Sequence, residues 1–185
     1  MSRIGKQPIA VPAAVKVNLD PATRTITVEG PKGRLSFTYR PEVNVTWNQD
    51  EKSITCSIDE SQMENKVARA LWGTTRAQIR NMVVGVTEGY TKRLEVIGVG
   101  WGPKMAGRNL QLNLGFANAI TMTPPPGVEF AVEGNAIVVS GPDKAAVGEF
   151  AAEIRAKRPP EPYNGKGIKY ADEVIQRKQG KVFGA

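Results

Sequence analysis

"PEVNVTWNQDEKSITCS", residues 41–57, carries the pattern that decides the fold of this chain. Val43, Val45 and Trp47 alternate with polar residues, and a second alternating run begins at Ile54 after a polar turn. Alternation with period two puts the apolar side chains on one face, which is typical of half-buried antiparallel strands. The stretch therefore predicts a β-hairpin with one face on a core.

The same pattern recurs in "PPPGVEFAVEGNAIVVS", residues 124–140. In both places the second strand ends in "I-x-x-S" and is followed by an acid-led turn and a helical pattern. We therefore expect an α+β fold in which one small unit, an antiparallel sheet with one main helix packed on it, occurs twice. The residues matched at a constant offset are Pro41 with Pro124, Val45 with Val128, Trp47 with Phe130, Ile54 with Ile137, and Ser57 with Ser140.

Two amphipathic helices are predicted from the change of period after each hairpin. The first lies in "DESQMENKVARALWGTTRAQIRNM", residues 59–82, with Asp59 or Ser61 as the expected N-cap. The second, in residues 141–157, is expected to turn Val147, Phe150 and Ile154 toward the core. The expected inner face of the first helix is formed by Met63, Val67, Leu71, Thr74, Gln78 and Met82, with Ala70 and Ile79 beside it.

These patterns divide the chain into three parts. Residues 1–82 form the first repeat, which carries a basic N-terminal arm, and residues 83–158 form the second. Residues 159–185 form a basic extension rich in proline and glycine.

The composition argues against catalysis and against a membrane span. Of the 185 residues, 41% are hydrophobic and 23% charged, which is ordinary for a globular protein, and no apolar run approaches membrane-spanning length. The chain has no histidine, so the usual general base and the commonest metal ligand are missing. Cys56 lies two residues from both Ile54 and Ile58, on the same expected strand face, and is expected to be a buried core thiol. We expect a cytoplasmic protein that is not an enzyme and has no cofactor, metal or small-molecule substrate.

Positive charge is concentrated near the two ends of the chain. The net charge is +7, and residues 155–181 hold eight Lys or Arg against three acids. Since a merely solubilising surface would intersperse the signs, this distribution favours a polyanionic partner such as a nucleic acid.

"RPPEPYNGKGIKYADE", residues 158–173, is the strongest candidate for contact with that partner. Its prolines forbid helix and stiffen the chain, and its composition is unlike that of a regular strand. Gly165 and Gly167 are expected to let backbone amides approach a phosphate, with the charge of Lys166 between them and Tyr163 suited to stacking. A disordered basic tail is the alternative.

Other cations have weaker support. Arg155, Lys157 and Arg158 close the second helix, where its dipole favours cations in any case. An ordinary charged arm explains Arg3 and Lys6 equally well, and an exposed turn is the favoured explanation of Lys104 and Arg108.

Three stretches resemble the bacterial form of the large-ribosomal-subunit protein six family: "MSRIGKQPIAVP", "GVTEGYTKRLEVIGVGW" and "PEPYNGKGIKYADE". The resemblance covers essentially the whole chain in order. It implies a structural protein that binds large-subunit (23S) rRNA through phosphate and shape contacts, near the stalk base and the translation-factor binding region, beside neighbouring ribosomal proteins. A non-ribosomal module that binds acidic protein partners is the alternative.

The resemblance also implies which residues meet the rRNA. The family usually has lysine where this chain has Asn164, which puts a direct phosphate contact at that position in doubt. Arg3, Lys6, Lys104 and Arg108 remain additional candidates. The expected contacts are Arg155, Lys157, Arg158, Tyr163, Gly165, Lys166, Gly167, Lys169, Arg177, Lys178 and Lys181.

Overall fold

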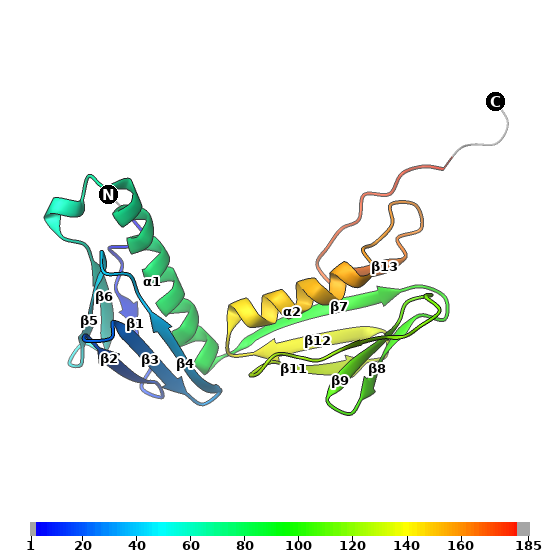
Figure 1. Ribbon diagram of the computed structural model, residues 1–185, viewed down its shortest axis with the longest axis horizontal. Helices are drawn as coiled ribbons and strands as arrows, with labels where there is room; N and C mark the ends of the chain where they lie inside the picture. The colour runs from blue at the N-terminus through cyan, green and yellow to red at the C-terminus, as the bar shows by residue number, and fades with distance from the viewer. Residues whose placement is uncertain (1–2, 181–185) are drawn as a thin grey trace. The chain divides into compact units, whose positions relative to one another are not determined.

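A computed structural model describes residues 3–180, which form two compact units (Figure 1). One unit holds the residues up to Gly89 together with Pro142–Lys144, and the other holds Tyr90–Gly141 and the residues from Ala145 onward. Helix α1 spans Lys66–Thr87, so a division of the chain at residue 82 would cut through this helix.

The first unit packs two antiparallel three-stranded sheets and α1 around one core. The sheets have the strand orders β1-β6-β5 and β2-β3-β4. In the hairpin that was expected from residues 41–57, Val45 pairs with Cys56 and Trp47 with Ile54. The strands are β1 (Ile9–Ala10), β2 (Lys16–Asp20), β3 (Thr25–Gly30), β4 (Gly33–Thr38), β5 (Asn44–Asn48) and β6 (Ser53–Ser57).

The second unit has the same plan with one strand more. Its sheets have the orders β10-β9-β8 and β11-β12-β7-β13, and helix α2 (Lys144–Lys157) runs along the second of them (Figure 1). Val147, Phe150 and Ile154 of α2 are all buried, as predicted. The strands are β7 (Tyr90–Ile97), β8 (Gly102–Ala106), β9 (Asn109–Asn113), β10 (Ile120–Met122), β11 (Glu129–Glu133), β12 (Ala136–Gly141) and β13 (Gly167–Tyr170).

The expected internal duplication is present, but its register is not constant. In the second hairpin Val132, not Phe130, pairs with Ile137. The reason is the turn, because four residues separate the paired ends Asn48 and Ser53 of the first hairpin and only two separate the paired ends of the second. A shift by two residues keeps every side chain on its face, so the hydrophobic pattern alone does not reveal it.

Helix α1 begins later than expected. Its N-cap is Asn65, whose side chain accepts a hydrogen bond of 2.9 Å from the backbone N–H of Val67. Asp59 and Ser61 both lie before it. Ser61 belongs to a single 3₁₀ turn, η1 (Glu60–Gln62), and Asp59 is the residue before that turn. An Asx side chain satisfies one of the free N–H groups of the first helical turn, so Asn65 fixes the start of the helix.

The inner face of α1 is also rotated from the predicted one. Val67 is 62% exposed and Gln78 is exposed, whereas Trp72 is buried and donates from Nε1 to the backbone oxygen of Cys56 at 2.7 Å. Because the large Trp72 side chain is buried, the residues on the same side of the helix are buried as well. The buried residues are Ala68, Trp72, Thr75, Arg76, Ile79, Met82, Val83, Gly85 and Val86.

The Pro/Gly-rich extension contains a regular strand that its composition did not predict. β13 pairs antiparallel with β7, Gly167 opposite Ile97 and Tyr170 opposite Leu94. Ile168 has no exposed surface and belongs to the core of the second unit. Burial of Ile168 together with the backbone pairing holds the strand, although glycine and lysine are depleted in strands. Within residues 3–180, no helix is long and apolar enough to cross a membrane.

Candidate nucleic-acid interface

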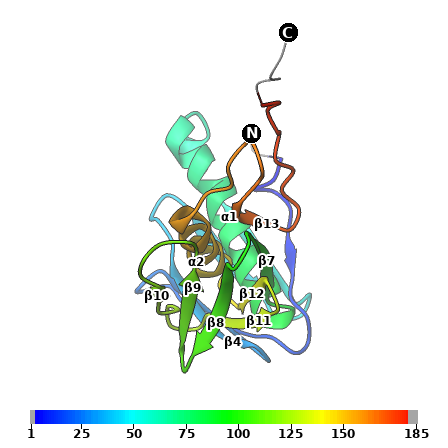
Figure 2. The same cartoon turned by 90° about the vertical axis from the view of Figure 1, so that its right-hand side faces the viewer.

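Residues 159–166 form a closed loop between α2 and β13. The N–H of Glu161 donates to the oxygen of Lys166 at 2.9 Å, and the N–H of Ile168 donates to the oxygen of Arg158 at 2.8 Å. Further along, the N–H of Lys178 donates to the oxygen of Pro162 at 2.9 Å. Figures 1 and 2 show this loop and the chain after β13 projecting from the same end of the second unit. The segment is therefore a shaped loop rather than a slack linker.

The two glycines of the loop shape its backbone. Gly167 has a φ of +144°, and a Cβ placed on it would lie 2.5 Å from the Cα of Pro160. Gly165 has a φ of +73° and lies beside the guanidinium of Arg177. Both glycines are buried by the chain itself, and a contact between their backbone and a phosphate stays a prediction. Their role is to allow the turn that presents Lys166.

Arg158 lies close to two aromatic rings. Its Cζ is 4.9 Å from the centroid of Trp101 and 4.7 Å from that of Phe116, within the range of cation–π interaction. Sequence reasoning missed both rings. The "GVGWG" stretch, residues 98–102, is the signal that could have located Trp101. This ring packs against Gly98 and Gly115, where a side chain would leave no room for it.

A surface pocket of about 300 Å³ opens beside this stack, and we call it the arginine–aromatic pocket. Arg158 and Lys166 give it two positive charges, and Glu161 gives it one negative charge. Lys166 is exposed and forms no ion pair with any residue from 3 to 180. The pocket is lined by Trp101, Arg158, Pro159, Glu161, Asn164 and Lys166.

Two of the predicted contact residues are already engaged within the chain. Arg155 forms a bidentate ion pair with Glu173, with its Nε 2.8 Å from Oε2, and these hydrogen bonds lower the pKa of the Glu173 carboxyl. The Nζ of Lys169 lies 3.2 Å from a carboxylate oxygen of Glu95. Both cations hold the extension on the unit and are partly neutralised, which sequence reasoning did not foresee.

The other predicted contact residues in and near the extension are accessible in the described part of the chain. Tyr163 is 56% exposed, and Lys157, Arg177 and Lys178 are exposed as well. Lys181 lies outside the described residues. The structure therefore brings Arg158, Lys166 and Tyr163 onto one loop region, with further cations on the chain beside it.

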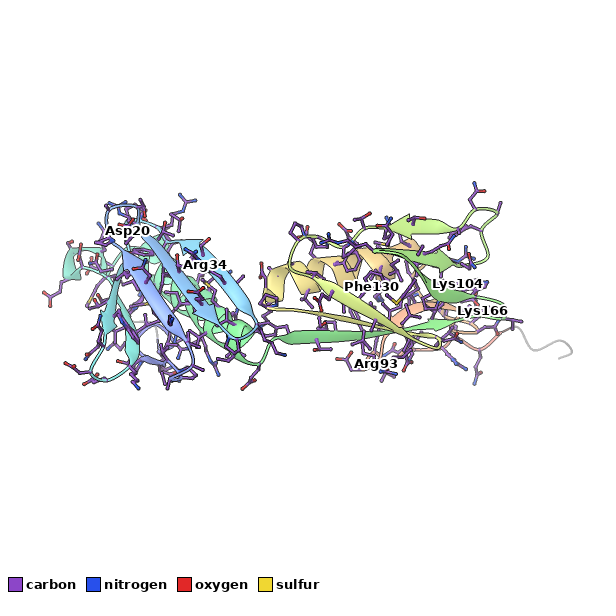
Figure 3. All side chains as sticks on the ribbon, turned by 90° about the horizontal axis from the view of Figure 1, so that it is seen from below. Asp20, Arg34, Arg93, Lys104, Phe130 and Lys166 are labelled. Atoms are coloured by element: carbon purple, nitrogen blue, oxygen red, sulfur yellow. The ribbon has the colours of Figure 1, made fainter. Side chains whose placement is uncertain are left out.

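The hairpin of β8 and β9 carries Lys104 and Arg108, both exposed. Figure 3 shows Lys104 and Lys166 at the end of the second unit where β7 ends. In the first unit Arg3 and Lys6 are exposed on an arm that is held in place by the packing of Gly5 against the Trp72 ring.

No constellation for catalysis accompanies these surfaces in residues 3–180. No group of three metal-ligating side chains comes together in this part of the chain. The thiol of Cys56 is buried, and burial raises its pKa to about 11, which removes it as a nucleophile near neutral pH. The fold and the site thus define a class: a duplicated α+β binding protein with a cationic loop surface.

Comparison with known proteins identifies the family. The family model described as ribosomal protein L6 matches residues 11–89 and 97–171, one match in each half. Proteins named large ribosomal subunit protein uL6 are 47% identical in Persephonella marina and 48% in Carboxydothermus hydrogenoformans, over the whole of this chain and 99% and 98% of theirs. The relative in Listeria welshimeri is 48% identical over 98% of this chain and 99% of its own. The chain belongs to the ribosomal protein L6 family, which confirms the predicted family and a ribosomal protein rather than an enzyme.

Proposed function

We propose that the chain is a structural constituent of the large ribosomal subunit that binds 23S rRNA through the arginine–aromatic pocket and the cations around it. Its likeness to proteins named large ribosomal subunit protein uL6 supports the ribosomal part of the proposal. The observation that carries the rRNA part is the pre-positioned Arg158 beside the unpaired Lys166. The proposal includes a place near the stalk base and the translation-factor binding region, with neighbouring ribosomal proteins as further partners in the cytoplasm.

The contact is made to phosphates and to shape. The deep, narrow major groove of A-form RNA hides its base edges, so phosphates and 2′-hydroxyls are what a cation reaches. Lys166 supplies a mobile point charge, while Arg158 supplies a planar fork whose orientation is fixed by two rings. Glu161, on the pocket rim, repels phosphate on its side and so restricts the direction from which the backbone approaches.

The test measures the affinity of the full chain for large-subunit rRNA fragments at several salt concentrations. Each neutralised phosphate contributes about 0.7–0.9 to the slope of log affinity against log salt. Lys166→Ala should lower the slope by about that amount, whereas Lys16→Ala, which removes an exposed charge on β2, should leave it unchanged.

A second variant separates charge from geometry. Arg158→Lys keeps the charge but replaces the planar group that the rings hold, so affinity should fall while the salt slope changes little. Equal slopes for the wild type and Lys166→Ala would remove Lys166 from the interface and with it the proposed mode of binding.

A further inference from the structure

Arg76, in the middle of α1, is a buried cation without an acidic partner. It is 7% exposed, and its Nε donates to the backbone oxygen of Gln7 at 3.2 Å. Its Nη2 lies 3.5 Å from the side-chain oxygen of the same residue, and it forms no ion pair within residues 3–180. A guanidinium keeps its charge and has five N–H donors. Arg76 makes two hydrogen bonds, both to Gln7, so within the described residues its charge has no carboxylate partner and it can donate to a further group.

A surface pocket of about 280 Å³ adjoins Arg76, and we call it the β1-edge pocket. Arg80, one turn further along α1, also lines it, and no carboxylate does. Like charges four residues apart on a helix repel each other, and an anion between them would relieve that repulsion. The pocket is lined by Gln7, Pro8, Ile9, Ala10, Arg76, Arg80, Val83 and Val84.

Strand β1 in the floor of this pocket is the edge of its sheet. The N–H of Val11 donates to the oxygen of Lys52 at 2.8 Å, so the backbone groups of Val11 point toward β6. Backbone groups alternate in direction along an antiparallel strand, so those of Ala10 point to the open side. The edge therefore presents a donor and an acceptor next to two arginines.

The second unit shows what occupies the corresponding place. Ile54 of β6 corresponds to Ile137 of β12, and their partners across the sheet are Ile9 of β1 and Leu94 of β7. Strand β7 is thus the counterpart of β1. Its outer edge is not open, because β13 pairs along it.

A helix arginine also lies near this edge in each unit. Counting back two residues from Ile9 and Leu94 makes Gln7 the counterpart of Lys92. Arg76 bonds Gln7, and the ring of Tyr170 lies 5.6 Å from Lys92 Nζ and 5.9 Å from Arg155 Cζ. In the first unit the helix arginine thus bonds this strand position directly, whereas in the second unit Arg155 and Lys92 share a contact with the ring of Tyr170, which belongs to β13.

In the second unit that arginine is satisfied by a carboxylate on the chain segment that covers the edge. Arg155 pairs with Glu173, three residues after β13, and Glu173 also accepts from the N–H of Tyr170 at 3.1 Å. The first unit has the strand edge, the arginine and the pocket, but within residues 3–180 no strand pairs with that edge.

We propose that the β1-edge pocket binds an extended segment of a partner protein, and that an Asp or Glu of this segment pairs with Arg76. Pro8 has no N–H and Pro12 follows closely, so backbone pairing is short and centred on Ala10. The carboxylate consequently supplies most of the selectivity, and Arg80 strengthens the attraction. This protein contact belongs to the first unit and is independent of the rRNA contact proposed for the second.

The test titrates the isotope-labelled full chain with a capped peptide of residues 166–174, KGIKYADEV, and follows the NMR signals of Ala10, Arg80 and the Arg76 side chain. Saturable shifts at all three are expected. The same peptide with Glu173→Gln should bind at least about tenfold more weakly, because the charge pair is lost. The NMR signals of β7 show separately whether the peptide replaces the chain's own β13 in the second unit.

Two chain variants locate the site. Arg80→Glu alters an exposed residue and preserves the fold, and it should weaken peptide binding by about tenfold or more. Arg40→Glu, an equally exposed charge reversal in the same unit, should have no effect. The proposal is overturned if the peptide produces no saturable shifts, or if the glutamine peptide binds equally well. It is also overturned if an oligouridylate displaces the peptide and binds these residues more tightly, since the site would then be an RNA site.

Discussion

Gly167→Ala tests whether close backbone packing holds the extension on the second unit. The native φ of +144° is a region that residues with a Cβ rarely adopt, and strain of this kind costs about 1–3 kcal/mol. The new Cβ would also lie 2.5 Å from the Cα of Pro160 and 2.7 Å from the oxygen of Pro159. These are backbone atoms, so no rotamer change relieves the contact, and overpacking adds about 1–3 kcal/mol. The sum is about 2–6 kcal/mol.

Amide hydrogen exchange measures this loss of stability locally, in β13. The N–H of Ile168 is protected by its bond to the oxygen of Arg158, and opening of β13 exposes it. Since about 1.4 kcal/mol corresponds to a factor of ten, exchange at Ile168 should accelerate at least about thirtyfold. Binding to rRNA should weaken in parallel, because the loop that presents Lys166 loses its anchor.

Gly107→Ala is the matched control. Gly107 also has a positive φ, +62°, but nothing lies within 4 Å of the position its Cβ would take. It should therefore show only the conformational cost, in its own hairpin, and leave Ile168 exchange unchanged. If Gly167→Ala leaves Ile168 as protected as the control does, close packing on the prolines does not hold the strand.

Three further outcomes are expected. The ion pair with Arg155 lowers the pKa of Glu173 below its ordinary value of 4.5. The pair therefore stabilises the fold above pH 4.5, and this stabilisation is lost as the pH falls through the folded pKa. Glu173→Gln should remove this pH-dependent stabilisation, as measured by urea midpoints at about pH 6 and about pH 3. Cys56, with a pKa of about 11, should resist iodoacetamide at about pH 8 in the folded chain and react readily in urea, as mass spectrometry will show. Asn65→Ala should lower the free energy of unfolding of the first unit by about 1 kcal/mol, while Ser61→Ala changes it little.

Much of the fold was predictable because it depends on local periodicity. Alternation at residues such as Val45 and Ile54 located the strands, and the recurrence of the pattern revealed the duplication. The face of α1 was not predictable in the same way, because small and polar residues such as Ala68 and Thr75 are buried beside Trp72. A search for large apolar side chains does not select such small residues as core positions.

The candidate site was located by composition, but its internal contacts were not. Strand β13 was missed because its pairing partner, β7, lies some seventy residues earlier in the chain, and no local signal reports such a contact. The engagement of Lys169 by Glu95 was hidden for the same reason, and that of Arg155 by Glu173 was hidden because the two residues are 18 positions apart, on either side of the loop and β13. Lys166 was recognised because its neighbours are glycines and prolines, which reveal an unusual backbone locally.

Strand β13 also fixes the order in which the two units become native during synthesis. The first unit draws its strands and α1 from residues before Gly89, so it has nearly all of its sequence early. The second unit begins at Tyr90, yet its edge is completed only when Gly167–Tyr170 has been made and joins β7. Domains fold from the N-terminus as the chain is produced. The cationic loop therefore matures last, and a nascent chain has the β1 edge in place before it has the surface proposed for rRNA.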